Sequence, residues 1–546
     1  PPNPRPLPSP PLPVHYTRRD PHRPADATAP MYPGAFSDKH PDRPAVVLTG
    51  SSARATYGEL EAASCRLAQH WHGLGLRPGD HVAAYLDNRI EYFEVFWAAI
   101  RSGLYLTPVN RYLAADEAAY IVEDCGAKAL VASAALPVAA ELGERLDDLG
   151  RCPERLAVGG AIEGYDDYGD ALAAAPARRL DQEPRGRTMF YSSGTTGRPK
   201  GIKRPLTGET VDAPDPKQSA IRQGLFAIRE CCVYLSPAPL YHAAPLAFTT
   251  GTQAEGGTVV VMEKFDAEAA LAAIELHRAT TSQWVPTMFS RMLKLPREIR
   301  ERYDVSSLEV AVHAAAPCPV EVKRQMIEWW GPILREYYAG SEGNGTCFID
   351  STTWLSKPGS VGRPVNATVH VCDEEGAELP AGSPGTIYFE QEEDVELFEY
   401  HNDPGKTSES RHPHRPRWTT LGDVGYLDED GFLFLTDRKA FMIISGGVNI
   451  YPQEIENVLV LHPKVLDVAV IGVPHEDMGE EVKAVVEPAP GVEPDDRLAE
   501  ELEDFARQRL ASFKVPRSFD FVDRLPRLPT GKLYKQQLRA RYWPAG

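Results

Sequence analysis

Short apolar runs that alternate with helical stretches constrain the fold of this chain more than any other feature of its sequence. Residues 44–49 (PAVVLT) and 80–87 (DHVAAYLD) predict strands, and the apolar positions of residues 91–103 recur at helical spacing. Such alternation predicts an α/β domain with helices layered against a sheet. Later strand-like runs each end in small or polar residues, and ligand sites in α/β sheets gather at such strand ends. We therefore expect several strand ends to contribute to a binding site.

The composition is that of an ordinary globular protein. The 546 residues are 42% hydrophobic and 25% charged, which suggests roughly three or four domain-sized units. A net charge of −19 argues against nucleic acid or an anionic membrane as the main partner. No apolar run approaches the roughly 18 residues that a membrane-spanning helix needs. The eight cysteines include no CxxC pair, which is typical of a reduced, cytoplasmic protein.

Three regions are expected along the chain. Residues 1–30 are rich in proline and lack an apolar signal-peptide core, so they predict an extended arm with polyproline character. Residues 31–437 predict the large N-terminal domain. Residues 438–546 predict a small C-terminal domain of mixed helices and strands.

Two stretches within these regions carry more specific predictions. Residues 134–185 are rich in Ala, Asp, Glu and Arg with little periodicity, which predicts surface helices and connections. Residues 425–439 predict a β-hairpin that turns at Asp430 and Gly431.

The stretch Tyr191–Gly201 (YSSGTTGRPKG) is the most informative for function. Its glycines let backbone N–H groups approach a ligand closely, and its hydroxyls together with Lys200 are donors suited to phosphate oxygens. It follows residues 187–190, a strand-like run, so we expect it at the C-terminal end of a strand. Composition alone also allows a flexible linker. It is not a Walker loop, because no GxxxxGK followed by Ser or Thr is present.

Four further stretches combine glycines with charged or aromatic side chains. They are YYAGSEG (337–343), TLGDVGY (420–426), DRKAFMIISGGVNIYPQEIE (437–456) and PTGK (529–532). Each alone has a structural explanation, such as a turn-capping aspartate, a solvated loop acid or a surface lysine.

Together and in this order, the five stretches resemble the adenylate-forming superfamily, which includes acyl-CoA synthetases, adenylation domains of peptide synthetases and firefly-type luciferases. The resemblance extends from about residue 40 to the C-terminus, and YSSGTTGRPKG is its most specific motif. It implies an α/β fold, with a large N-terminal domain of two α/β subdomains plus a β-barrel. It also implies a small, mobile C-terminal α+β lid.

The resemblance implies that the chain binds ATP, Mg²⁺ and a carboxylic acid, and forms an acyl-adenylate. Residues implied to hold the phosphates are Ser192, Ser193, Gly194, Thr195, Thr196, Lys200 and Ser341. Residues implied around the adenine are Ala315, Ala316, Pro317 and Tyr338, and Gly340 is implied to be a further cofactor-binding residue. Asp423 and Arg438 are implied to hold the ribose, and Glu342 to bind Mg²⁺. Lys532 is implied to stabilise charge as the mixed anhydride forms.

The second half-reaction of the family transfers the acyl group to the thiol of coenzyme A after the lid rotates. The resemblance implies that His242 is a gate and that Gly446 and Gly447 line the pantetheine passage, where only residues without Cβ leave room. At the hinge position the family has Asp or Lys, whereas this chain has Ala440. One hypothesis is that the chain mainly thioesterifies an acyl-adenylate supplied by a partner adenylating enzyme. The alternative is that Ala440 is tolerated.

An acyl-CoA ligase is the expected function. The segment PLYHAAPLAF (239–248) contains no Asp or Glu that would bind the ammonium group of an amino acid. The expected acyl pocket is apolar and suits a fatty, aryl or polycyclic acid; its predicted residues are Ala243, Ala244, Leu246, Trp284, Met288, Phe289 and Ala314. An adenylation domain that loads a carrier protein, a luciferase-like oxidase and a non-catalytic binding protein remain alternatives. The oligomeric state stays open, and a dimer is compatible with the sequence.

Overall fold

The computed structural model describes residues 32–192, 198–392, 397–438, 441–445, 448–475, 477–527 and 533–543. Several predicted features lie outside these residues: the arm 1–30, Ser193, Gly194, Thr195, Thr196, Ala440, Gly446, Gly447 and Lys532. The backbone of Arg438 is described, but its side chain is not. No helix in the described ranges is long and apolar enough to cross a membrane.

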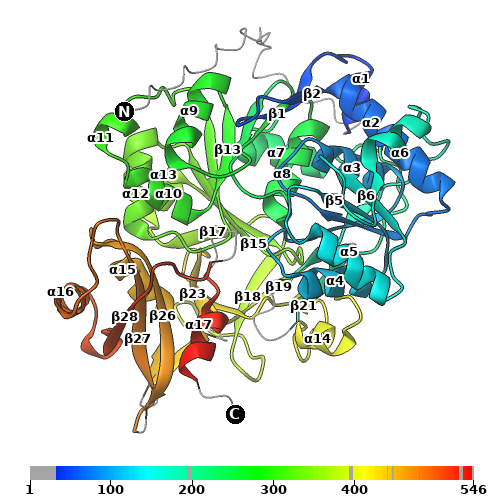
Figure 1. The fold of residues 1–546 in the computed structure, drawn as a ribbon. Helices are drawn as coiled ribbons and strands as arrows, with labels where there is room; N and C mark the ends of the chain where they lie inside the picture. The colour runs from blue at the N-terminus through cyan, green and yellow to red at the C-terminus, as the bar shows by residue number, and fades with distance from the viewer. Residues whose placement is uncertain are drawn as a thin grey trace.

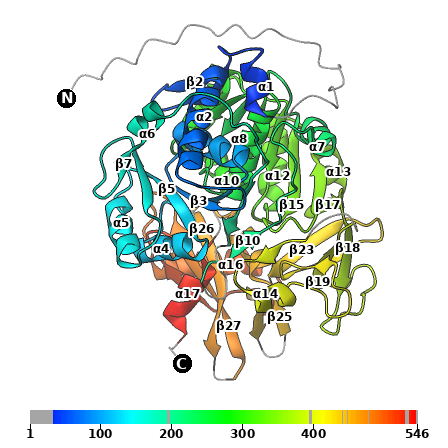
Figure 2. The same ribbon diagram turned by 90° about the vertical axis from the view of Figure 1, so that its right-hand side faces the viewer.

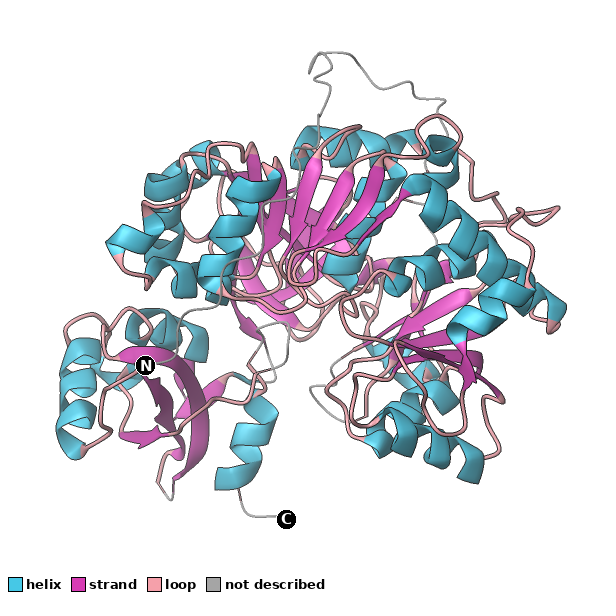
Figure 3. Cartoon of the chain, turned by 45° about the horizontal axis from the view of Figure 1, so that its top comes forward, coloured by secondary structure: helices cyan, strands magenta, loops and turns pink. Residues whose placement is uncertain are grey.

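The first α/β unit is a parallel sheet of six strands in the order β7-β6-β5-β3-β4-β8. Its strands are β3 (His81–Tyr85), β4 (Tyr105–Pro108), β5 (Ala127–Ser133), β6 (Glu154–Val158), β7 (Asp166–Asp167) and β8 (Arg187–Thr188). The helices of this region are α2 (Tyr57–Gly73), α3 (Glu91–Arg101), α4 (Ala115–Asp124), α5 (Ala139–Asp148) and α6 (Tyr168–Ala174). Helices lie on both faces of the sheet (Figure 3), as a parallel sheet requires.

The prediction that residues 134–185 contain only surface helices and connections is wrong. They include β6, of which Leu156, Ala157 and Val158 are buried against β5. The strand has only three consecutive apolar residues, preceded by Glu154 and Arg155, and so it left no clear period-2 pattern in the sequence.

The second α/β unit is the parallel part of a sheet of 14 strands. Its strands are β1 (Pro44–Leu48), β2 (Arg54–Thr56), β11 (Val233–Ser236), β12 (Thr258–Val261), β13 (Thr281–Trp284), β14 (Val310–His313) and β15 (Leu334–Ala339). All neighbours among them pair in parallel except β1 and β2. The helices around it are α7 (Pro216–Phe226), α8 (Ala243–Ala254), α9 (Ala267–His277), α10 (Pro286–Leu293), α11 (Arg297–Arg300), α12 (Val320–Trp330) and α13 (Ser351–Ser356).

Antiparallel strands continue this sheet beyond β15 in the order β16-β17-β23-β22-β19-β18. They are β16 (Thr346–Asp350), β17 (Ser360–Pro364), β18 (Thr368–Cys372), β19 (Gly385–Glu390), β22 (Asp423–Leu427) and β23 (Leu433–Arg438), with β21 (Trp418–Thr419) beside β19. The hairpin predicted at Asp430 and Gly431 is confirmed as β22 and β23. In the described part of the chain β18 pairs with β19 at the end of this series, and closure of the strands into the expected β-barrel stays a prediction.

The C-terminal unit has its own sheet of five strands, ordered β25-β24-β27-β26 with β28 beside β27. The strands are β24 (Ile443–Ser445), β25 (Val448–Ile450), β26 (Val465–His475), β27 (Gly479–Pro488) and β28 (Ser518–Phe521). Its helices are α15 (Pro452–Leu459), α16 (Asp496–Arg507) and α17 (Lys535–Tyr542), with a 3-10 turn at Ser512–Lys514. Figure 1 shows this unit in orange and red below the large sheet. The domain boundary at residue 437 stays a prediction.

A short three-stranded sheet completes the fold beside the first α/β unit. It contains β9 (Phe190–Tyr191), β10 (Gly201–Lys203) and β20 (Glu399–Tyr400), and α14 (Pro404–Glu409) follows β20.

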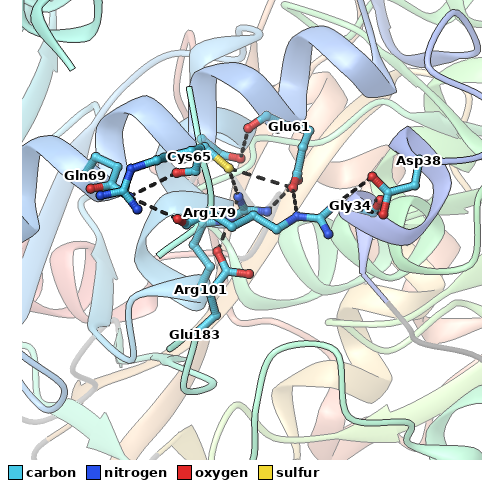
Figure 4. Close-up of polar contacts among 10 residues, drawn as sticks. Gly34, Asp38, Glu61, Cys65, Gln69, Arg101, Arg179 and Glu183 are labelled. Carbon is cyan, nitrogen blue, oxygen red and sulfur yellow. Dashed lines mark hydrogen bonds and ion pairs between the residues drawn. The ribbon is translucent and has the colours of Figure 1, made fainter. Parts of the chain in front are cut away.

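A buried ionic cluster fixes the N-terminal helix α1 (Pro33–Ser37) to α2 and α3 (Figure 4). The side chain of Arg101 is 1% exposed and contacts Glu61 at 2.5 Å and Glu183 at 3.5 Å. Arg179 joins Glu61 (2.7 Å) to Asp38 at the end of α1 (2.9 Å). Burial opposes ionisation of Glu61, but Arg101 and Arg179 together lower the pKa of its carboxyl below the ordinary value. The cluster therefore depends on every one of its charges being paired.

Candidate active site

A cavity of ≈ 1270 Å³ lies between the strand ends of the large sheet and the C-terminal unit. Residues that follow β11, β13, β14 and β15 line it, namely Ala238, Val285, Ala314 and Gly340. Residues of the C-terminal unit line the opposite side, among them Gln453, Asp467, Arg527 and Leu533. The predicted meeting of strand ends at one binding site is thus observed.

The base of the predicted phosphate loop is the hairpin of β9 and β10, with Tyr191 opposite Gly201. The backbone N–H of Ser192 donates to the carbonyl of Lys200 (2.8 Å), and the N–H of Lys200 donates to the Ser192 hydroxyl (3.3 Å). These two bonds hold both ends of the loop together. The loop therefore joins two strands of a hairpin, whereas the sequence predicted only a strand before it.

The two described polar residues of the loop differ in position. Ser192 lines the cavity, whereas Lys200 is not among its lining residues. The Lys200 ammonium lies 3.9 Å from the Asp403 carboxylate and 5.8 Å from the centre of the Tyr400 ring. Burial and the neighbouring Lys406 lower the pKa of Lys200. The structure therefore does not bring this ammonium into the cavity.

A polar wall of the cavity is built around Tyr338, on β15, and Asp423, on β22. The Tyr338 hydroxyl donates to Oδ2 of Asp423 at 2.6 Å, and Asp423 is 8% exposed. Ala315, Ala316 and Pro317 line the cavity as well, and Ala315 has φ +74°. A non-glycine residue in this left-handed region is strained, and such strain occurs mainly where surrounding structure enforces it near a site.

Gly340, Ser341 and Glu342 follow β15 and line the same wall. A Cβ at Gly340 would lie 2.7 Å from the methyl carbons of Leu421 and 2.9 Å from Oε2 of Glu342, so a larger residue would have to displace one of these side chains. The Tyr400 hydroxyl donates to Oε1 of Glu342 at 3.0 Å.

Glu342 fits the expected Mg²⁺ ligand by its position and chemistry. No cluster of three or more His, Cys, Asp or Glu side chains that suits a metal occurs in the described ranges. Mg²⁺ in nucleotide sites needs only one or two carboxylates, because substrate phosphates and water complete its octahedron. A single glutamate on the cavity wall meets that requirement.

His242 is the N-cap residue of α8 and lines the cavity. Its ring lies 4.1 Å from the ring of Tyr241. Its Nε2 is buried and accepts or donates no hydrogen bond within the described structure. Burial lowers the pKa of His242 to about 3, so the imidazole is neutral near pH 7. It suits a steric gate better than an acid.

The apolar part of the cavity only partly matches the predicted acyl pocket. Ala243, Ala244, Trp284 and Ala314 line it as predicted. The prediction is wrong for three residues, which pack into the hydrophobic core instead: Leu246, Met288 and Phe289.

Aromatic residues not named among the predicted pocket residues form much of this wall. The Phe248 and Tyr337 rings stack at 5.8 Å, and the Phe226 ring meets Phe248 edge-on at 5.0 Å. Ile221, Arg222 and Leu225 of α7 also line the cavity. The spacing of residues 218, 221, 222 and 225 was an available signal for one helix face.

The C-terminal unit contacts the rest of the chain through a second set of residues that the sequence did not predict. The Lys294 ammonium, just after α10, donates to the carbonyls of Val465 (2.9 Å) and Leu466 (3.2 Å). Within the C-terminal unit, Arg527 pairs with Asp467, and both residues line the cavity.

The two ends of the C-terminal unit lie differently with respect to the cavity. Leu533, Tyr534 and Lys535, directly after Lys532, line it. Ile444 and Val448, on either side of Gly446 and Gly447, are 50% and 45% exposed, and no described residue of β24 or β25 lines the cavity. Figure 2 places β25 at the lower edge of the molecule, away from α8 and α10.

Comparisons with known proteins agree with this geometry. Residues 35–393 match the AMP-binding enzyme family, and residues 454–532 match the AMP-binding enzyme C-terminal domain. A feruloyl-CoA synthase of an Amycolatopsis species is 34% identical over 494 residues, covering 89% of this chain and 94% of that protein. The fatty acid–[acyl-carrier-protein] ligase ScoC of Streptomyces coeruleorubidus is 32% identical over 526 residues, covering 93% and 95%.

A solved structure shows the same fold. The o-succinylbenzoate CoA synthetase MenE from Bacillus subtilis, in complex with its acyl-adenylate intermediate, matches with a TM-score of 0.75 and 26% identity, covering 93% of this chain and 98% of that one. The family matches span most of the chain, and the relatives match over nearly their whole length. The chain therefore belongs to the AMP-binding enzyme family, in the acyl-CoA synthetase branch of the adenylate-forming superfamily, and is an ATP-dependent acid–thiol ligase.

Proposed function

We propose that this ligase activates an apolar aryl or fatty acid at the carboxyl end of the large sheet and transfers its acyl group to coenzyme A. The observation that carries the proposal is the two-sided cavity. One side carries the polar wall of Tyr338, Asp423 and Glu342, and the other carries the apolar wall of Phe248 and Tyr337. A nucleotide and an acyl group therefore have complementary surfaces within one cavity.

In the first half-reaction a carboxylate oxygen of the acid attacks the α-phosphorus of ATP, and the bond to pyrophosphate breaks. The proposed roles give Tyr338 the adenine face, Asp423 and Arg438 the ribose, and the hairpin loop with Ser192 and Ser341 the phosphates. Mg²⁺ at Glu342 would offset phosphate charge that repels the attacking carboxylate. Lys532 is proposed to stabilise the charge that develops at the reacting centre.

In the second half-reaction the thiolate of coenzyme A attacks the acyl carbonyl, and the bond to AMP breaks. We propose that the lid, residues 438–546, turns about Ala440 between the two steps. The present orientation, with Leu533 and Tyr534 at the cavity and Val448 exposed, supports assignment to the first step. We propose that the neutral His242 side chain moves aside, so that the thiol can reach the acyl carbonyl.

The decisive test measures pyrophosphate release and thioester formation with ATP, coenzyme A and a panel of fatty and aryl acids. The proposal expects both products with the same acids. Pyrophosphate release without thioester would overturn the thiol assignment. Thioester formation only from supplied acyl-adenylate would instead favour the partner-dependent enzyme suggested by Ala440.

A carrier-protein thiol is the second candidate acceptor, because the relative from Streptomyces coeruleorubidus is named as an acyl-carrier-protein ligase. A competition between coenzyme A and a phosphopantetheinylated carrier protein at equal concentration separates the two acceptors. Preferential loading of the carrier would contradict the coenzyme A assignment.

A further inference from the structure

Arg222 of α7 places a charged side chain among apolar residues at the far end of the acyl side of the cavity. The residues of α7 that line the cavity include Gln218, Ile221, Arg222 and Leu225, which form a single helix face. Ile221 and Leu225 make that face apolar, whereas Arg222 places a guanidinium with five N–H donors in it. A charge in an apolar wall is costly unless it has a partner.

The guanidinium of Arg222 is only weakly paired within the protein. Its Nη1 lies 3.5 Å from Oε1 of Glu255, and this oxygen is buried without a hydrogen bond in the described structure. The other oxygen of Glu255 accepts from the hydroxyl of Ser219 (3.1 Å) and the amide of Gln223 (3.2 Å). Glu255 is therefore fixed by Ser219 and Gln223, but its contact with the guanidinium of Arg222 is long.

The packing of α8 leaves space for this guanidinium. A Cβ at Gly251 would lie 3.0 Å from Nε and 3.4 Å from Cδ of Arg222. Glycine inside a helix destabilises it relative to alanine, so its presence here is consistent with a packing requirement. The Arg222 side chain crosses α8 at this glycine and reaches the cavity.

The length of α8 sets the scale of the acid. His242 begins the helix and lies at the proposed reacting end, whereas Gly251 lies nine residues later. At 1.5 Å per residue, the two positions are about 13 Å apart along the helix axis. This space suits a ring carried on a short carbon chain rather than a bare benzoic acid. The stacked Phe248 and Tyr337 rings between the two ends suit a planar group.

Carboxylates outnumber the cations near the far end. Glu255 lies 3.5 Å from Arg222, and Glu209 lies 3.2 Å from the neighbouring Arg185. Burial lowers the pKa of Arg222, while Glu255 and Asp215 raise it. A second carboxylate on the substrate would add uncompensated negative charge in a desolvated place. A neutral oxygen accepts a hydrogen bond from Arg222 without that cost.

We propose that Arg222 selects acids whose far end carries a neutral oxygen acceptor, such as a ring hydroxyl or methoxy group, and that the substrate is an oxygenated arylpropenoic or arylalkanoic acid. This inference rests on the proposed function, and it adds the substrate class and a specificity-determining residue. A group that satisfies the donors of Arg222 gains affinity, whereas an acid without it leaves them unpaired.

The test compares kcat/KM for pyrophosphate release with 4-hydroxycinnamate, cinnamate and 4-carboxycinnamate. The wild type is expected to prefer 4-hydroxycinnamate over cinnamate at least tenfold and to use 4-carboxycinnamate no better than cinnamate. Arg222→Met is expected to reduce the first ratio to about 1 while cinnamate activity remains. Lys217→Met, on the same helix with its side chain 83% exposed, is the matched control and keeps the wild-type ratio.

A second variant keeps the test valid if Arg222→Met does not fold. Gly251→Ala pushes the guanidinium from α8 and is expected to change KM for 4-hydroxycinnamate but not for cinnamate. Equal use of the oxygenated and plain acids by the wild type overturns the inference while leaving the proposed function intact. Preference for 4-carboxycinnamate overturns the neutral-oxygen assignment. Release of pyrophosphate with none of these acids, but with fatty acids, overturns the substrate class alone. Failure with every acid overturns the proposed function too.

Discussion

Lys294 provides the clearest test of how the C-terminal unit is held in its present orientation. Its ammonium bridges from the end of α10 to two carbonyls at the start of β26, at 2.9 and 3.2 Å. Because one of these carbonyls also belongs to the cavity-lining residue Leu466, the contact lies beside the proposed site. Lys294→Met removes both hydrogen bonds and keeps most of the aliphatic stem.

The expected magnitude follows from the exposure of the contact. A hydrogen bond to a charged group contributes about 1.5–3 kcal/mol when shielded. Lys294 is exposed, so solvent screening reduces the pair of bonds to about 1 kcal/mol. This changes the ratio of the two lid orientations about fivefold. Lys294→Arg is expected to change it little, because a guanidinium also donates to carbonyls.

Two assays separate the half-reactions. Pyrophosphate release reports the first step, and thioester formation from synthetic acyl-adenylate reports the second. Lys294→Met is expected to reduce kcat/KM of the first about fivefold and to leave the second unchanged or faster. Arg297→Met, whose side chain is 77% exposed, is the control. An equal loss in both assays, or no loss in the first, would refute the role of Lys294 in holding the orientation.

Three further perturbations test the site and the fold. Tyr338→Phe removes the hydrogen bond to Asp423 and is expected to raise KM for ATP about fivefold in steady-state kinetics, with KM for the acid unchanged. Glu61→Gln leaves Arg101 buried with a missing partner and is expected to lower the free energy of unfolding by about 3 kcal/mol in urea titrations. Because the pKa of Glu61 is lowered in the folded protein, the stabilisation by its carboxylate is present above about pH 4.3 and is lost as the pH falls through the folded pKa. His242 has a lowered pKa of about 3, so its neutral form favours folding above about pH 6.5 and this contribution is lost as the pH falls toward 3. His242→Phe is expected to leave the pH profile of thioester formation between pH 5.5 and 8 unchanged in shape, and a break near pH 6.5 that disappears in this variant would contradict the neutral gate.

Local patterns in the sequence predicted most elements but not which faces of them meet. The helix at Glu91–Arg101 and the hairpin at Asp430 agree with prediction, because periodicity and turn chemistry are local. Leu246 was assigned to the pocket wrongly because the first half of α8 is apolar on all sides, and hydrophobicity there does not distinguish the core face from the cavity face.

Contacts between distant segments could not be predicted from the sequence, for a different reason. Arg222 and Glu255 are 33 positions apart, and Lys294 and Val465 are 171 apart. Neither pair belongs to a recurring motif, so composition and spacing give no signal for them. The polar wall, in contrast, was predictable because Tyr338, Glu342 and Asp423 each belong to a short stretch that the resemblance covers.

If Asp423 and Arg438 bind the ribose as proposed, the register of β22 and β23 links ATP binding to the orientation of the lid. Asp423 and Arg438 are direct partners across this antiparallel pair, and β23 ends at Arg438, just before the C-terminal unit begins. Tyr338 donates a hydrogen bond to Asp423 on β22, while the chain continues into the lid from Arg438, the last residue of β23. If the lid orientation changes the spacing of this pair, ATP must bind the two orientations with different affinities. By reciprocity, ATP then shifts the orientation by the same factor, and the ladder acts as a thermodynamic coupling between the two.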